Sequence, residues 1–233
     1  MPATDTLARS VTDALHARRS VRAFTGRAVD PALLKEVFAA AQRAPSGGNL
    51  QPWQAVVLTG APWQAVKDAV AARIAMGRAG YQPEYDIYPK ALTDPWEARR
   101  FGVGEALYAS LGIAREDKRG RLAQFMHNYT GFGAPVMLFL HCSRIMGPPQ
   151  WADMGMWLQS VMLLLVEKGL ASCPQECWAM YGETVRAALA IGDDQILFTG
   201  LAIGYADEEA AVNRWPVPRA GVDEAIDWRG FGE

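Results

Sequence analysis

The chain has 233 residues, of which 50% are hydrophobic and 21% are charged. This composition is typical of a globular protein with one sizeable core, and it excludes a largely disordered chain. The formal net charge of -2 and the isoelectric point near 6.0 exclude a surface built to coat nucleic acid or an anionic membrane. The three cysteines are too few for a disulfide framework.

The first residues, MPATDTLARS, are polar and contain no apolar signal core, so we expect a cytoplasmic protein. The most apolar stretch, residues 154–166, is too short to span a bilayer. The histidines and cysteines do not show a spacing typical of zinc ligands. We therefore expect no membrane partner, no nucleic-acid partner and no metal.

In the first third of the chain, helical spacing of apolar residues predicts a helix over residues 11–18. Asp30 and Pro31 are an N-cap and a first-turn proline, and the helix that they begin ends at Ala44-Pro45. The loop SGGN follows. The segment WQAVVLTG then predicts a strand over residues 53–60, and residues 61–74 predict an amphipathic helix.

Residues 77–96 have no clean period and are rich in tyrosine, proline and tryptophan, so we expect an aromatic insert that is functional. The pattern D-x-x-E at Asp94 begins a helix that ends near Gly112. The remaining expected elements are a helix over 116–129, a buried strand over 134–142, an apolar helix over 154–168, a strand within DDQILFTGLAIGY and an extended tail over 213–228. Such interleaving predicts one α+β or α/β domain over residues 1–233.

The helix over 154–168 is apolar on nearly all sides, which indicates burial. Two places could bury it equally well, the centre of the domain or a two-fold interface.

The segment ARRSVRAF, residues 17–24, gathers Arg18, Arg19, Ser20 and Arg22. Forked guanidinium donors and a hydroxyl suit a phosphate group. The alternative is a solvated helix end, where arginine complements the helix dipole. The apolar residues that follow the cluster indicate that the chain enters the core there, which favours the phosphate.

Two further segments have the chemistry of a ligand site. In APSGGNLQPW, residues 44–53, the glycines allow close approach of the backbone to a flat ligand, although an ordinary connecting loop explains them as well. In SCPQECW, residues 172–178, Pro174 predicts a turn that leaves Gln175 and Glu176 at the end of the apolar helix. Its spacing is C-x-x-x-C, which disfavours a thiol redox couple.

The segment GVGEAL, residues 102–107, lacks the third glycine of a dinucleotide fingerprint and falls inside a predicted helix, so we reject it as a nucleotide site. Arg219 in the tail is by itself more typical of a solvent-facing residue. Together with the N-terminal cluster it could complete a phosphate clamp.

Taken together, RRSVRAF, APSGGNLQPW, FGAPV, ASCPQE, LAIGYAD and NRWPVPR resemble, in this order, the motifs of the FMN-dependent nitroreductase family. The resemblance runs from about residue 15 to residue 228, and the insert and FGAPV are most similar to the nitrobenzoate-reductase branch. It implies an α+β fold with a central mixed sheet surrounded by helices. It also implies an interlocked homodimer with tightly bound FMN at the subunit interface.

The resemblance also implies a role for each matched position. The FMN phosphate and the pyrimidine side of the ring would be held by Arg18, Arg19, Ser20, Arg22 and Arg219. The partner subunit would supply Pro45, Ser46, Gly47 and Asn49. The ring would be lined by Pro174, Gln175 and Glu176, with the Glu176 backbone N–H facing flavin N5.

The implied activity is two-electron transfer from NAD(P)H to nitroaromatic or quinone acceptors in ping-pong order, with no obligatory acid or base side chain. Val217 and Cys177 stand where many family members have a basic residue and a glycine. Three alternatives remain at this point. The plainest is a soluble α/β domain whose arginines only decorate its surface. Another is an FMN enzyme with another substrate, such as a reductive dehalogenase, an enoate reductase or a flavin-destroying enzyme. The third is a flavin-binding module without turnover.

Overall fold

A computed structural model describes residues 10–231, so most of the polar N-terminal segment lies outside the described residues. The longer helices in chain order are α1 (Val11–Ala17), α2 (Pro31–Ala41), α3 (Gly60–Ile74), α4 (Trp96–Ser110), α5 (Lys118–Met126), α6 (Pro148–Glu167), α7 (Gly182–Ala188) and α8 (Val222–Ala225). Short 3-10 turns are η1 (Gly47–Asn49), η2 (Gly77–Gly80), η3 (His127–Gly133), η4 (Glu176–Met180) and η5 (Ala211–Asn213). The strands are β1 (Gln54–Thr59), β2 (Val136–Ser143), β3 (Ala171–Gln175) and β4 (Gln195–Gly204).

The four strands form one sheet in the order β1-β2-β4-β3, and each neighbouring pair is antiparallel. The fold is α+β, but the expected mixed sheet is corrected to an antiparallel one. The reason lies in the crossover through α6. It joins β2 to β3, which run in the same direction, but β4 lies between them and pairs with both. Within the described residues, parallel pairing is limited to isolated bridges such as Ser20 with Ser172.

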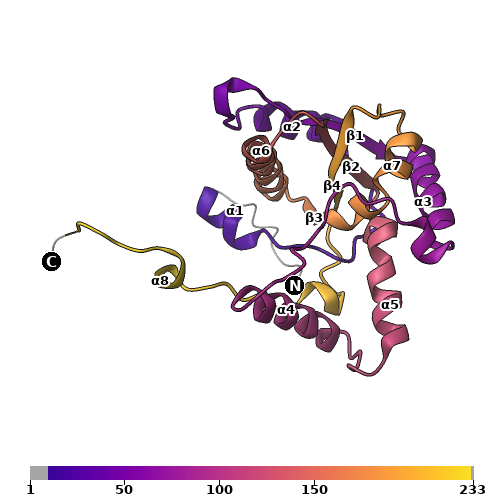
Figure 1. Cartoon of the computed structure of the whole chain (residues 1–233). Helices are drawn as coiled ribbons and strands as arrows, with labels where there is room; N and C mark the ends of the chain where they lie inside the picture. The colour runs from indigo at the N-terminus through magenta and orange to yellow at the C-terminus, as the bar shows by residue number, and fades with distance from the viewer. Residues whose placement is uncertain (1–9, 232–233) are drawn as a thin grey trace.

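The sheet is covered by helices on both faces, and the alternation along β2 explains how (Figure 1). Leu138 and Leu140 pack into one apolar cluster with α2 and α6. Met137 and Phe139 point the opposite way, into a second cluster with α3 and α7. Successive side chains of a strand face opposite sides of a sheet, so a continuous apolar run such as this one fills both cores.

Helix α6 buries one face within the chain, where Met154, Trp157 and Leu165 are almost inaccessible. Its opposite face is partly open, and Met156 is 40% exposed. Packing inside the chain thus buries one apolar face of α6. The face that contains Met156 stays free for a two-fold interface.

The N-terminus of α2 is confirmed as expected, because the Asp30 carboxylate accepts a hydrogen bond from Ala32 N at 2.8 Å. Helix α4 begins at Trp96, and Asp94 caps it through Ala98 N at 3.2 Å, without a reciprocal bond from Glu97. The expected turn at Pro174 is wrong, since this residue lies inside β3 opposite Leu201. Proline fits there because β3 is an edge strand whose outer N–H needs no partner.

The C-terminal segment after η5 runs away from the body of the molecule and carries α8 at a distance from the sheet (Figure 1). Residues 216–231 are exposed along their whole length. The tail is therefore extended, as expected, apart from the single turn of α8. Among the described helices, none combines the length and apolar character needed to cross a bilayer.

Candidate active site

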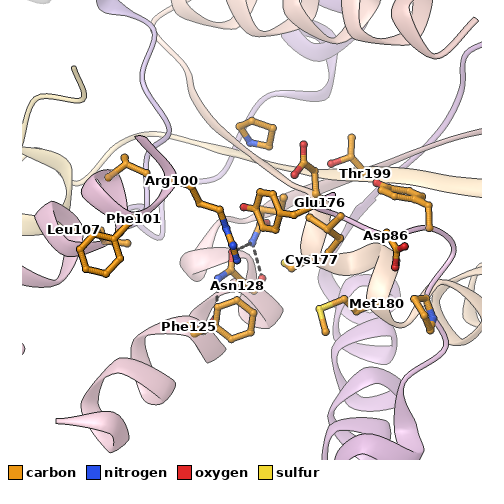
Figure 2. A pocket seen from close by; sticks show the side chains of 18 of the residues that line it. Asp86, Arg100, Phe101, Leu107, Phe125, Asn128, Glu176, Cys177, Met180 and Thr199 are labelled. Atoms are coloured by element: carbon orange, nitrogen blue, oxygen red, sulfur yellow. Dashed lines mark hydrogen bonds between the residues drawn. The ribbon is translucent and has the colours of Figure 1, made fainter. Parts of the chain in front are cut away.

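A pocket with a volume of about 1500 Å³ lies between the end of strand β3 and helix α4. One side is formed by the end of β3 and by η4, and includes Gln175, Glu176 and Cys177. Figure 2 shows Phe101 and Leu107 of α4 on the opposite side of this pocket. The aromatic insert supplies a third side. The pocket is thus wide, partly aromatic and lined by elements far apart in the sequence.

Gln175 is buried at the end of β3 and joins the pocket to η3. Its amide nitrogen donates a hydrogen bond to the Asn128 backbone oxygen at 2.7 Å. Its side-chain oxygen is buried and has no hydrogen-bond partner among the described residues. Trp151 also lines the pocket, and its indole nitrogen is likewise buried without a hydrogen-bond partner among the described residues. Buried polar atoms are rarely left unpaired, but Thr25, Trp157 and Trp178 have such atoms as well, so this feature does not by itself mark a ligand.

The arginine-rich segment passes beside β3 and so reaches the pocket. Ser20 forms a parallel bridge with Ser172, and Val21 N donates to Ser172 O at 3.0 Å. This register brings Arg22 level with Pro174, and both residues line the pocket. The sequence prediction that the chain enters the core after the cluster is confirmed, because Val21 is buried.

The predicted phosphate residues are not equivalent in the structure. The pKa of Arg18 is lowered, first by burial and then by the charge of Arg219. Among the described residues, Arg18, Arg22 and Arg219 have no acidic partner. Arg19, in contrast, forms an ion pair with Glu208 on the surface. The structure separates Arg19 from the other three.

The loop with Pro45, Ser46, Gly47 and Asn49 does not line this pocket. It is held at the N-terminal part of α6, where the buried carboxylate of Asp153 accepts a hydrogen bond from Gly47 N at 3.2 Å. The Ser46 hydroxyl accepts from Gln51 N at 3.0 Å. Gly48, at φ +58°, has the left-handed backbone that glycine favours. These hydrogen bonds fix the loop, and its glycines and Asn49 are exposed.

The pocket also contains residues that the sequence patterns did not single out, among them Arg100, Phe125, Asn128 and Trp151. In Figure 2, Arg100 extends from α4 toward the centre of the pocket. Its guanidinium lies 4.0 Å from the ring centroid of Tyr88 in the insert. These residues lie on helices at ordinary amphipathic spacing, so the sequence offered no signal beyond the aromatic density of the insert.

Burial shifts the pKa values of the titratable groups at the end of β3 and in η4, whereas the hydrogen bond from Arg121 lowers the pKa of Glu105 on the opposite side of the pocket. Burial raises the pKa of Glu176 above its ordinary value. Burial also raises the pKa of Cys173 to about 11, and that of Cys177 still further. Neutral thiols are poor nucleophiles, so neither cysteine is activated for redox chemistry. Clusters of metal-ligating side chains are absent from the described part of the chain.

The pocket at the edge of the antiparallel sheet has aromatic walls and contains Arg22 and Arg100 beside several acidic side chains, so it suits a flat, aromatic ligand. Arg18, Arg19, Ser20 and Arg219 are not among the residues that line it. The nitroreductase family model matches residues 15–205, and the chain belongs to this family.

Among curated proteins, the chain is 34% identical to nitroreductase NfnB of Mycolicibacterium smegmatis over 94% of this chain and 92% of that protein. It is also 34% identical to 4-nitrobenzoate reductase of Pseudomonas putida, over 92% and 93%. Among solved structures, an FMN- and NADPH-dependent nitroreductase NfnB from Sphigopyxis sp. strain HMH is 81% identical, with a TM-score of 0.94 over 95% of this chain and all of that one. The structure of the M. smegmatis protein with NADPH has a TM-score of 0.88 at 32% identity, over 94% and 99%.

Proposed function

We propose that this protein is an FMN-dependent oxidoreductase that transfers two electrons from NADPH or NADH to nitroaromatic or quinone acceptors. The observation that carries the proposal is the pocket, which joins Arg22 and the Pro174–Glu176 segment to an aromatic wall. Its likeness to an FMN- and NADPH-dependent nitroreductase at 81% identity supports the cofactor and the reductant. The names of the nitrobenzoate and nitrobenzene reductases support the acceptor class.

The arginines of the N-terminal segment, together with Arg219, fit the FMN phosphate. The charges of Arg18 and Arg22 both lower the pKa of the Cys173 thiol, and the charge of Arg219 lowers the pKa of Arg18. Like charges gathered without acidic partners repel each other, and a phosphate relieves that repulsion. We propose that Arg18, Arg22 and Arg219 hold the phosphate and that Ser20 adds a neutral donor. Arg19 contributes little to phosphate binding, since it already forms an ion pair with Glu208.

The end of β3 fits the flavin ring. Pro174, Gln175 and Glu176 line the pocket and would line the ring. When bound, FMN would supply the electron-transfer chemistry, which amino-acid side chains lack. The protein supplies orientation and charge. The backbone N–H of Glu176 and the guanidinium of Arg22 would stabilise negative charge on the ring edge.

We propose that the second face of the cofactor site comes from a second copy of the chain. Pro45, Ser46, Gly47 and Asn49 do not line the pocket of their own chain, and hydrogen bonds hold their loop in place. The extended tail leaves apolar side chains exposed, including Ile226 at 49% and Trp228 at 59%. A homodimer would cover this surface and bring the loop to the partner's pocket.

We propose that reductant and acceptor use the same pocket and therefore bind in turn, in ping-pong order. Tyr81, Phe101 and Phe125 would stack against either ring and exclude water. No described acid or base occupies a position that the reaction requires, and protons can come from solvent.

The insert at about 77–96 would act as substrate wall and lid within a single FMN-binding domain over residues 1–233. Replacing Tyr81 and Tyr88 with leucine should change the preference among acceptors by about tenfold and leave flavin content intact. Loss of flavin from that variant would contradict this role. We also propose a cytoplasmic location, where NAD(P)H is available.

The visible spectrum of the purified protein tests the proposal. We expect a yellow protein that bleaches on anaerobic addition of NADPH and recovers its colour when a nitroaromatic compound is added. A parallel titration with NADH decides the preferred reductant. A protein that stays colourless after incubation with FMN would overturn the proposal. A yellow protein that NADPH cannot bleach would be a binding module, and one that bleaches but is not reoxidised by nitroaromatics would act on another acceptor.

A further inference from the structure

The first part of the insert is hydrogen-bonded to the body of the protein and is not a free loop. Gln82 forms a parallel bridge with Tyr181, and Gln82 N donates to Met180 O at 2.8 Å. Two residues later, Glu84 N donates to Ala179 O at 2.9 Å. The segment 81–85 is therefore bonded along η4, the same turn that supplies Glu176 and Cys177 to the pocket.

Side chains alternate along this segment as they do in a strand. Tyr81, Pro83 and Tyr85 line the pocket. Gln82 and Glu84 point the other way, toward α7. The Gln82 amide oxygen accepts from the Thr184 hydroxyl at 2.7 Å, and its amide nitrogen donates to Glu183 at 2.7 Å. One side of the segment 81–85 thus faces the pocket, and its opposite side is hydrogen-bonded to α7.

Glu84 is the strongest of these anchors. Its side chain is only 4% exposed and lies between two arginines. Arg186 Nε donates to it at 2.7 Å, and an Arg144 terminal nitrogen donates at 2.6 Å. Arg186 is itself 7% exposed and is held further by Asp193 at 2.8 Å. A carboxylate so deeply buried is stable only while its partners stay in place.

Gly182 lies against the side chain of Glu84, although the two residues are far apart in the sequence. A Cβ atom at Gly182 would lie 2.1 Å from Glu84 Cγ. The absence of a side chain at 182 is what allows the Glu84 stem to pass.

Tyr85, the residue after Glu84, lines the pocket and is itself held in place. Its hydroxyl donates a hydrogen bond to the Phe198 carbonyl oxygen on β4. Its ring stands edge-on to Trp151, with 5.3 Å between the ring centroids. Two adjacent residues of the insert are thus fixed to different parts of the body, one to α7 and the other to β4.

The second part of the insert lacks such anchors. Within the described part of the chain, the hydrogen bonds and ion pairs of residues 86–95 run to each other or to α4. Asp86 pairs with Lys90 at 3.5 Å on the surface, and Asp94 bonds to Ala98 N. The change occurs directly after Tyr85.

We propose that Glu84 is a positioning residue that fixes residues 81–85 as a rigid wall against which aromatic acceptors are sized, and that only residues 86–95 adapt to the ligand. The inference rests on the proposed function. It divides the insert into two parts with different roles, where the sequence predicted one functional insert.

Glu84→Gln tests the inference, because it keeps the shape of the side chain and removes the charge that holds the two arginines. We expect KM for nitrobenzene to rise about tenfold, KM for the larger 1-nitronaphthalene to rise less, and kcat to stay within about twofold. Glu36→Gln is the matched control, since Glu36 is an exposed acid paired with Lys168 at 3.2 Å. It should leave both KM values unchanged.

Amide hydrogen exchange gives a second readout that does not depend on turnover. In the wild-type protein, residues 81–85 should be protected and residues 86–95 should exchange rapidly. Glu84→Gln should remove the protection of 81–85 and leave 86–95 unchanged. Equal protection and equal KM values in wild type and Glu84→Gln would overturn the inference.

Arg144→Gln covers the case in which Glu84→Gln fails to fold. Arg144 is 39% exposed, so its loss leaves the Glu84–Arg186 pair intact. We expect the same KM shift at about threefold, and an unchanged KM would overturn the inference. A wild-type protein without FMN would overturn the proposed function as well. A flavoprotein that NADPH bleaches, but whose variants behave as wild type, would overturn only the role of Glu84.

Discussion

The side chain of Asn213 holds the backbone of Arg22 in place. Its amide oxygen accepts a hydrogen bond from Arg22 N at 2.8 Å, and its amide nitrogen donates to Ala23 O at 2.9 Å and to Asp207 O at 2.8 Å. Asn213 is 5% exposed. A residue from the NRWPVPR motif thus fixes the arginine that the RRSVRAF motif brings to the pocket.

Asn213→Ala should lower the free energy of unfolding by about 2–4 kcal/mol, because it leaves buried backbone groups without partners. It should also weaken FMN binding, since Arg22 loses its fixed backbone. Urea unfolding and FMN titration measure the two effects. Asn213→Asp keeps the oxygen that Arg22 N needs and should retain more FMN affinity than the alanine variant. Equal FMN affinity in all three proteins would contradict the positioning of Arg22 by Asn213.

Arg18→Gln should weaken FMN binding by about 10- to 100-fold, since it removes one charge-assisted bond to the phosphate. The loss should shrink as salt concentration rises, because part of the attraction is screened. Arg19→Gln is the comparison, and we expect less than about a twofold change because Arg19 already pairs with Glu208 on the surface. Fluorescence titration with FMN measures both. Equal losses would mean that the structural separation of Arg18 from Arg19 does not apply to the holoprotein.

Gln175→Glu should weaken FMN binding by about tenfold or more, because it places a second carboxylate beside Glu176 and removes the bond from the Gln175 amide nitrogen to Asn128 O. Gln54→Glu, on the exposed edge strand β1, is the control and should bind FMN as the wild type does. If Gln175→Glu also binds FMN normally, Gln175 does not line the ring.

The cysteines should react slowly in the folded protein. At pH 8, a thiol with a pKa of about 11, such as Cys173, is about 0.1% thiolate. Cys142 is also buried, and burial raises its pKa. We expect an aromatic disulfide reagent to label all three cysteines quickly in urea and only slowly without it. Fast labelling of the folded protein, or an internal disulfide seen by mass spectrometry, would revive the thiol couple.

His141 should make stability depend on pH. Burial lowers its pKa, partly offset by a hydrogen bond with Gln195 at 3.1 Å. The unfolded state then binds more protons than the folded state, so the free energy of unfolding falls as pH drops below about 6.5. His141→Gln should flatten this slope, and His16→Gln, at an exposed position of α1, should not. Denaturant unfolding between pH 7 and pH 5 measures the slope. Identical slopes in the wild type and His141→Gln would contradict the assignment.

The elements with local signals were predictable from the sequence. Asp30-Pro31 begins α2 because an N-cap and a first-turn proline act within one helical turn. The apolar run in β2 is buried as expected, because a strand between two helical layers needs apolar side chains on both faces. The order of the motifs identified the family, and it pointed to Arg22, Pro174, Gln175 and Glu176, which do line one pocket.

Other features depended on contacts between residues remote in the sequence. The antiparallel order follows from where β4 inserts between β2 and β3, and no local pattern encodes that. Pro174 lies in a strand because β4 pairs with it on one side only. Arg18 and Arg19 are adjacent and chemically alike, yet only Arg19 meets Glu208. The two parts of the insert look equally irregular in the sequence. Only the tertiary structure shows that Arg186 and Arg144 enclose Glu84, because a buried ion pair is specified by all of its partners together.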